Sequence, residues 1–241
     1  MTNYQTMSLG QLLALAPPGW GGTLLSGLGV SLLVAGLGYL LGLLIGLGGA
    51  QLRRSRSLLG QDLVTLYTTL VRAVPELVLI LLVYFALPQA LNSLLGWLGL
   101  GKLAINGLVA GVLVIAFVQG AYATEVIRGA MNAVPLGQLE AAHSFGMRPW
   151  QVFRRILLPA MLPGALPGLS NLWLIATKDT ALLAVVGFAE LTLAARQAAG
   201  ATKHYFLFLM AAGVLYLLVS LLSNWLFKWL EQRLLPGRAH A

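Results

Sequence analysis

The feature that most constrains this chain is a series of long apolar segments without a charged side chain. Residues 21–47 form the first, residues 103–124 another and residues 205–227 a third. A helix needs about 20 predominantly apolar residues to cross the hydrocarbon core of a bilayer. Each segment meets that length, so we expect each to be a membrane-spanning helix.

The charge content supports the same conclusion. Only 9% of the 241 residues are charged and 59% are hydrophobic, whereas a soluble domain carries about 25% charged residues. Such a chain cannot cover its surface with groups that water solvates, so the bilayer is its expected solvent. Its length leaves room for roughly five or six spans with their loops. We predict one all-α integral membrane domain without a separate soluble domain.

Two further spans are expected, and each carries an interruption. Residues 62–87 form the second span in chain order, and Pro75 is expected to kink or break it because proline removes a helical hydrogen bond. The fourth span follows Pro159, and the neighbouring charges of Lys178 and Asp179 are expected to make it discontinuous. The total is then about five transmembrane helices.

The first 20 residues precede all of these spans. Residues 9–15 are expected to lie as a short helix in the membrane interface, which the prolines at 17–18 end. The chain then divides into an N-terminal interfacial segment at residues 1–20, a membrane domain at residues 21–232 and a polar tail at residues 233–241.

The basic residues predict the orientation of the chain in the membrane. Its net charge is +8, and Lys and Arg are more frequent on the cytoplasmic side of membrane proteins. Five spans put the two ends of the chain on opposite sides. With the N-terminus outside and the tail in the cytoplasm, ten basic residues are cytoplasmic and three are external. The cytoplasmic set is Arg53, Arg54, Arg56, Arg128, Arg148, Arg154, Arg155, Lys228, Arg233 and Arg238, and the external set is Lys102, Arg196 and Lys203.

Several classes of site lack support in the sequence. The chain has no cysteine for disulfides or thiolate metal sites, and its three histidines are scattered. Residues 96–103 match G-x-x-x-x-G-K, but Leu103 stands where a phosphate-binding loop needs Ser or Thr. The basic residues flank apolar spans, which favours a role in orientation over nucleic-acid binding. We expect no cofactor site and no nucleic-acid partner.

Residues 140–159 form the longest polar, charge-bearing stretch. We expect a short helix at residues 139–145, a left-handed turn at Gly146, and a second short helix from Pro149 to about residue 157. The groups available for contact with a partner are Trp150, Phe153, Arg154 and Arg155. The alternative is an ordinary amphipathic loop on the membrane surface.

The charges inside the spans admit two interpretations. An ionisable residue at the bilayer centre costs about 2.5–3.5 kcal/mol on insertion scales, and it faces a bundle interior or an aqueous cavity. Lys178 and Asp179 therefore form either a structural ion pair or one wall of a polar translocation path. Glu76, Glu125 and Glu190 raise the same question closer to the membrane interfaces.

Three motifs resemble those of one known family. The pattern E-A-A-x3-G-x9-I-x-L-P, from Glu140 to Pro159, resembles the signature loop of the membrane subunits of bacterial ABC importers. Residues 67–77 end in R-A-V-P-E-L, and residues 178–182 are K-D-T-A-L. Both resemble stretches of the branch that imports polar amino acids, particularly the histidine, lysine/arginine/ornithine and opine importers. Ala73 stands where that branch usually has glycine.

The resemblance implies a type I ABC importer-like permease with a cytoplasmic coupling-helix loop at residues 135–160. Such a subunit forms the pore in the bacterial inner membrane and moves a polar amino acid, here expected to be a basic one, or an opine by alternating access. It is not an enzyme, because ATP and Mg bind to a separate ABC ATPase dimer. The other implied partners are a second permease subunit, identical or homologous, a periplasmic or lipid-anchored solute-binding protein, and membrane lipids.

The resemblance also implies roles for individual residues. The residues expected to couple the pore to the ATPase are Glu140, Ala141, Ala142, Gly146 and Arg154. The substrate path is expected to include Asp179, Glu76 and Asn171. A cationic substrate favours an acidic partner in a low-dielectric cavity because the attraction between opposite charges is strong there.

Two other classes of function predict different sequence features. An ion-coupled secondary amino acid transporter would work without an ATPase and would carry internal repeats, and no convincing repeat occurs in the sequence. An intramembrane enzyme would place paired catalytic polar residues on facing helices, and no such pair stands out.

Overall fold

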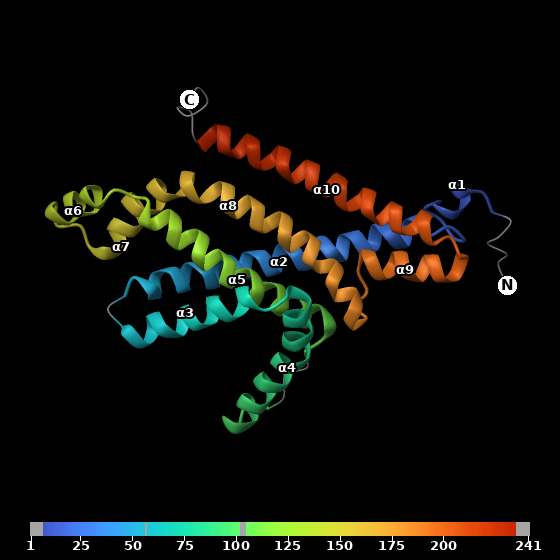
Figure 1. Cartoon of the computed structure of the whole chain (residues 1–241), viewed down its shortest axis with the longest axis horizontal. Helices are drawn as coiled ribbons and strands as arrows, with labels where there is room; N and C mark the ends of the chain where they lie inside the picture. Colours follow the sequence, from blue (N-terminus) through green and yellow to red (C-terminus); the bar gives the residue numbers. More distant parts are fainter. Residues whose placement is uncertain (1–6, 56, 102–104, 235–241) are drawn as a thin grey trace.

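The computed structural model describes residues 7–55, 57–101 and 105–234, which form helices joined by short turns (Figure 1). No strand occurs in these residues, and the all-α prediction is confirmed. The helices are α1 (Leu9–Leu12), α2 (Gly21–Arg53), α3 (Leu58–Ala73), α4 (Glu76–Trp97), α5 (Gly107–Asn132), α6 (Leu136–Ser144), α7 (Pro149–Val152), α8 (Leu158–Asp179), α9 (Leu191–Thr202) and α10 (Tyr205–Leu234). A π-helical segment, η2 (Phe153–Leu157), and a 3-10 segment, η3 (Thr180–Val186), flank α8.

Five helical segments of the described chain are long and apolar enough to cross a membrane, which agrees with the predicted number. They are Gly21–Arg53, Glu76–Trp97, Gly107–Asn132, Pro149–Val186 and Tyr205–Arg233. In Figure 1, α1 lies at one end of the long axis and the last turns of α10 lie toward the other, as an odd number of crossings requires. Of the residues used in the sequence analysis, Arg56, Lys102, Leu103 and Arg238 lie outside the described residues.

The second predicted span, residues 62–87, is two helices rather than one. Val74 is extended, with φ −93° and ψ 139°, and Pro75 caps the start of α4. The residue before a proline is disfavoured in the α-helical region, so α3 must end there. The predicted break is confirmed, but the bounds were wrong because α4 continues through Pro88 to Trp97. Figure 1 shows α4 leaving the bundle at a steep angle.

The fourth span has no gap at its charged residues. The chain stays helical through Pro163, Pro167, Lys178 and Asp179, so the expected discontinuity was wrong. What changes is the hydrogen bonding, which tightens from α-helical to 3-10 at Thr180. The 3-10 helix has fewer residues per turn than the α-helix and a poorer hydrogen-bond geometry.

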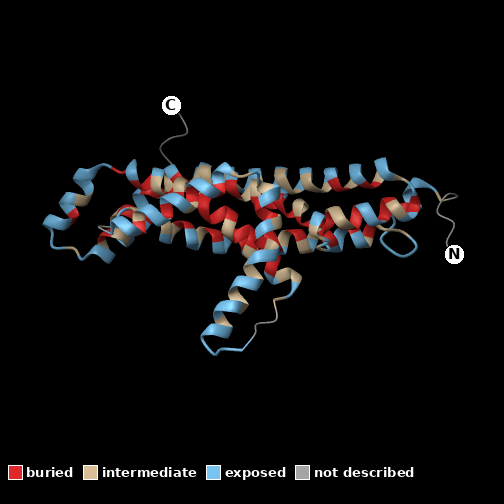
Figure 2. Ribbon diagram, turned by 60° about the horizontal axis from the view of Figure 1, so that its bottom comes forward, coloured by how far each residue is buried: buried red, intermediate tan, exposed pale blue. Residues whose placement is uncertain are grey.

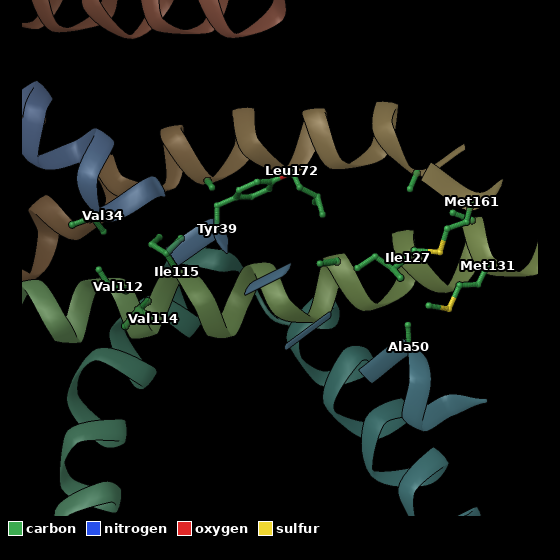
Figure 3. Packing of buried hydrophobic residues seen from close by; sticks show 14 of the residues in the cluster. Val34, Tyr39, Ala50, Val112, Val114, Ile115, Ile127, Met131, Met161 and Leu172 are labelled. Carbon is green, nitrogen blue, oxygen red and sulfur yellow. The ribbon is translucent and has the colours of Figure 1, made fainter. Parts of the chain in front are cut away.

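The core of the bundle is the seam between α2, α5 and α8. Val34 of α2 lies against α5, where Ile115 is fully buried, and the Tyr39 ring of α2 points toward α8 (Figure 3). The Tyr39 hydroxyl also donates to the carbonyl oxygen of Leu169 in α8, at 3.0 Å. One cluster of buried residues thus runs through all three helices, which makes this part of the molecule a single packed unit.

A ladder of small residues lets α2 approach α5 closely. A Cβ atom added to Gly42 would lie 2.9 Å from the Cβ of Gln119, and one added to Gly46 would lie 2.5 Å from the Cβ of Ala123. Carbon atoms do not approach that closely without displacement. Because lipid chains are as apolar as leucine, membrane helices gain their association energy partly from such close backbone packing. The glycine spacing therefore serves helix packing.

Gly46→Leu is expected to destabilise the bundle. The added side chain has no room against Ala123, and overpacking a filled core costs about 1–3 kcal/mol. The midpoint of heat-induced unfolding in mild detergent should fall by several degrees. Gly48→Leu is the matched control, since Gly48 is exposed on the same helix and has no atom within 4 Å of an added Cβ. Equal midpoints for the two variants would contradict the proposed packing role.

Two of the spans have little contact with the rest of the chain. Figure 2 shows mostly exposed and intermediate residues along α4, and α10 exposes large apolar side chains over most of its length. In the membrane these faces meet lipid or another membrane-embedded partner.

Candidate functional site

The turn between α5 and α8 is the first candidate site. We call residues 136–157 the α6–α7 elbow. Gly146 follows α6 with φ +72°, and its N–H donates to the His143 oxygen at 2.9 Å. The Met147 N–H donates to the Ala142 oxygen at 3.2 Å, so the turn satisfies the last carbonyl groups of α6. The predicted left-handed turn at Gly146 is confirmed.

The two short helices of the elbow also match their prediction, with shifted bounds. α6 begins at Leu136 rather than at residue 139. Pro149 is the first residue of α7, where its missing N–H costs no hydrogen bond. The helix then continues as the π-helical segment η2 to Leu157, which was the expected end.

The predicted coupling residues are not all on the surface. The exposed ones are Glu140, Ala141, Gly146 and Arg154. Ala142 is buried, with 4% of its surface exposed. Ala142 therefore packs α6 against the rest of the elbow, and the exposed four are the residues available to a partner.

The tip of the elbow carries large apolar side chains that the chain itself does not cover. Phe145 is 87% exposed, Leu136 70% and Trp150 66%. Trp150 stacks on Phe153, with ring centroids 5.6 Å apart. Exposed apolar groups on such a projecting segment indicate a contact with another protein or with the membrane surface. Phe145 was not predicted as part of this surface, because in the sequence it marks only the end of a helix.

The base of the elbow is fixed to the core. Leu157 is buried in the main cluster, and Leu139 and Phe153 pack against that cluster. The elbow is thus continuous with α8 and rests on the packed α2–α5–α8 unit. Contacts between side chains therefore connect the elbow to the spans.

Glu125 has a structural role close to the elbow. Its carboxylate pairs with Arg53 of α2 at 2.6 Å and with Arg128 of α5 at 2.7 Å. The Arg53 pair ties α2 to α5, the Arg128 pair lies within α5, and together they neutralise the carboxylate. Of the two interpretations given for Glu125, the structure therefore supports a structural ion-pair network.

The second candidate site is an acidic cluster in the middle of the bundle. Asp179 of α8 is buried, with 5% exposed, and it accepts a hydrogen bond from Gln119 Nε2 of α5 at 3.2 Å. Glu76, at the start of α4, interacts electrostatically with Asp179 and lies 3.5 Å from the Tyr122 hydroxyl of α5. Residues of three helices, α4, α5 and α8, thus gather around two carboxyl groups that are distant in sequence.

One atom of this cluster has no partner. Gln119 is 1% exposed, and its Oε1 accepts no hydrogen bond in the described residues. A buried acceptor without a donor costs about 1–3 kcal/mol. Two neighbouring carboxyl groups with an unpartnered amide oxygen on the adjoining side chain favour a ligand with several N–H donors and a positive charge. Sequence analysis missed Gln119 and Tyr122, because nothing in the apolar α5 segment signals which of its polar residues face Asp179.

Asn171 lies outside the acidic cluster, and Lys178 lies at its edge, where its charge acts on Asp179 without forming an ion pair with it. Lys178 is exposed, and the ion pairs of the described residues do not include one between Lys178 and Asp179. The structural ion-pair interpretation was therefore wrong. Asn171 is exposed on α8, eight residues before Asp179 and so about 12 Å away along the helix.

Glu190 belongs to a separate network. It is fully buried, caps α9 through the Leu193 N–H at 2.8 Å, and accepts from Tyr216 at 2.9 Å and Ser31 at 3.2 Å. These bonds join α2, α9 and α10. The carboxylate thus has three donors inside the protein, and its role is to hold these helices together. No group of three or more His, Cys, Asp or Glu residues suited to a metal ion occurs in the described part of the chain.

Comparisons with known proteins give one consistent result. Residues 38–236 match the family described as binding-protein-dependent transport system inner membrane component. The histidine/lysine/arginine/ornithine transport system permease protein HisQ of Escherichia coli (strain K12) is 41% identical over 219 residues, 91% of this chain and 96% of that protein. The nopaline transport system permease protein NocQ of Agrobacterium fabrum is 44% identical over 217 residues, 88% of this chain and 91% of that protein.

Solved structures agree with these relatives. The crystal structure of an amino acid ABC transporter with histidines has a chain that superposes with a TM-score of 0.74 at 30% identity, covering 89% of this chain and 95% of that one. An inward-facing structure of the MetNI methionine ABC transporter superposes with a TM-score of 0.66 at 16% identity, covering the same shares. The second likeness concerns the fold alone.

Proposed function

Since the chain belongs to the family of binding-protein-dependent transport system inner membrane components, we propose that it is the pore-forming permease subunit of an ATP-driven amino acid importer. The observation that carries this proposal is the likeness, over nearly the whole chain, to permease proteins of amino acid and opine transport systems. The chain moves its substrate by alternating access between two global states whose balance the partners bias.

The α6–α7 elbow is the proposed docking site of an ABC ATPase dimer, which binds ATP and Mg. Its exposed Glu140 and Arg154 supply charge, and its tip supplies Phe145 and Trp150 as apolar anchors. Aromatic side chains are enriched in the buried centres of protein interfaces. The packing of Leu157 in the core supports transmission of ATPase movement to α5 and α8.

The proposed orientation puts the elbow and the C-terminus in the cytoplasm and the N-terminus outside, in the bacterial inner membrane. The ten-to-three distribution of basic residues across the spans supports it. A solute-binding protein then meets the opposite end of the bundle. A second permease subunit, identical or homologous, completes the pathway. It packs beside α4 and α10, the two spans that have little contact with the rest of this chain.

The proposed substrate is a basic amino acid or an opine, and the acidic cluster is its proposed contact in the pore. Asp179 and Glu76 supply negative charge, and the free Gln119 Oε1 supplies a further acceptor. At an effective dielectric constant of about 20, opposite charges 4 Å apart attract by about 4 kcal/mol. Asn171 is not part of this contact.

Uptake into proteoliposomes tests the proposal. The chain should transport radiolabelled arginine or histidine when it is reconstituted with an ABC ATPase, a solute-binding protein and a second permease subunit of its transport system, and only with ATP. Omitting the ATPase subunit should reduce uptake to the level of empty vesicles. Uptake that a proton or sodium gradient drives without the ATPase would instead favour an ion-coupled secondary transporter.

A further inference from the structure

The end of the bundle opposite the α6–α7 elbow carries two apolar grooves that meet at one residue. The larger has a volume of about 900 Å³ and lies between α1, the start of α2 and the start of α10. The smaller, of about 520 Å³, lies between α9 and α10. Tyr205 lines both grooves, and Figure 1 shows these four helices together at that end. A molecule with two apolar chains can therefore straddle the first turn of α10.

The walls of both grooves are aliphatic and aromatic. The larger is lined by leucines of α1 and α2 and by Phe206, Met210 and Val214 of α10, and the smaller by Leu193 and Leu209. Several of these side chains are exposed, with Phe206 at 79% and Leu9 at 58%. No described part of this chain covers them, so their partner comes from outside it.

Basic side chains line both grooves. Lys203 and His204 line the larger groove, and Arg196 lines the smaller. Lys203 ends α9 in a left-handed conformation with φ +66°, and both Lys203 and Arg196 are exposed. Neither groove has an acidic residue in its lining.

The position of these charges along the bundle fits a lipid headgroup. Lys203 shares the larger groove with Gly21, the residue at which the first span begins, so it lies at the boundary between water and hydrocarbon. Arg196 lies deeper along α9, and a long arginine side chain extends toward the interface from such a position. The nearest acidic residue in sequence, Glu190, is fully buried and already accepts three hydrogen bonds, so it leaves the basic groups unneutralised.

We propose that this end of the bundle binds one anionic phospholipid. One acyl chain occupies the groove beside α1 and α2, the other occupies the groove beside α9, and Tyr205 lies between them. The phosphate group lies against Lys203 and His204, with Arg196 reaching it from below. Two apolar grooves with basic residues at their openings match the two acyl chains and the negatively charged headgroup of an anionic phospholipid. A protein partner would need neither feature.

Lipid retention by the full-length chain tests this site. The chain is purified in mild detergent, exchanged into an equal mixture of phosphatidylglycerol and phosphatidylcholine, and its bound lipid measured by native mass spectrometry. Phosphatidylglycerol should be enriched. Each basic residue near a membrane surface contributes roughly a fivefold preference for anionic lipid, so the double variant Arg196→Gln and Lys203→Gln should lose most of the enrichment. Lys228→Gln, an exposed cation at the other end of α10, should retain it.

A second pair of variants tests the apolar part independently of charge. Ala211 lines the larger groove, so Ala211→Phe should reduce the retention of both lipids severalfold. Gly213 is exposed, with open space around it, and Gly213→Phe should leave retention unchanged.

The proposal is wrong if the double charge variant keeps its phosphatidylglycerol enrichment, or if Lys228→Gln loses as much. It is also wrong if the species that Ala211→Phe disrupts is a dimer of this chain, because a second copy would then fill the groove.

Discussion

Glu140→Lys is expected to abolish ATP-driven uptake while the transporter remains assembled. Glu140 is exposed on α6, where the proposed ATPase contact forms. Reversing its charge puts a cation where the partner surface accommodates a carboxylate, and losing one member of a desolvated interfacial charge pair costs about 2–5 kcal/mol. Uptake into proteoliposomes should fall at least about tenfold. The apolar tip, with Phe145 and Trp150, is unchanged and should still hold the ATPase subunit during purification.

Gln138→Lys is the matched control for Glu140→Lys. Gln138 is also exposed on α6, but two residues correspond to about 200° around a helix, so it faces the other way. It adds the same cation to the same helix and should leave uptake close to the wild-type rate. Normal uptake by Glu140→Lys, or an equal loss in both variants, would remove Glu140 from the coupling role. Co-purification of the ATPase separates loss of coupling from loss of assembly.

Local rules account for much of what sequence analysis predicted correctly. Gly146 stands where a helix end needs a left-handed residue, and Pro75 constrains Val74 to an extended backbone. The number of spans follows from the length of the apolar segments. These features depend on a few neighbouring residues, so they can be inferred without knowing what packs against them.

The errors arose where distant residues decide the structure. The third span continues past residue 124 to Asn132, because Glu125 is neutralised by Arg53 of another helix and by Arg128. Lys178 and Asp179 are adjacent in sequence but do not pair, since the partner of Asp179 is Gln119, 60 residues away. A helix boundary or an ion pair inside a bundle depends on which side chains the facing helix places opposite it. Those pairings between helices cannot be read from a single sequence.

Asp179→Asn is expected to reduce uptake of cationic substrates at least about tenfold at concentrations below saturation. The change keeps the size of the side chain and its hydrogen bond from Gln119 Nε2 but removes the buried charge. If the acidic cluster neutralises a guanidinium or imidazolium group, that attraction disappears from the pore. Uptake should be measured for arginine and histidine at several concentrations, so that weaker binding is distinguished from slower turnover.

Asp62→Asn is the matched control, because it makes the same chemical change at an exposed position on α3. It should transport at the wild-type rate. An unchanged unfolding midpoint for Asp179→Asn would show that lost uptake does not come from a damaged bundle.

The assignment fails if Asp179→Asn transports arginine normally while Glu140→Lys does not, because the chain would then be coupled to an ATPase but would recognise its cation elsewhere. Gln119→Leu removes both the unpartnered acceptor and the Nε2 donor to Asp179, so a ligand that reaches this cluster predicts weaker uptake by this variant as well.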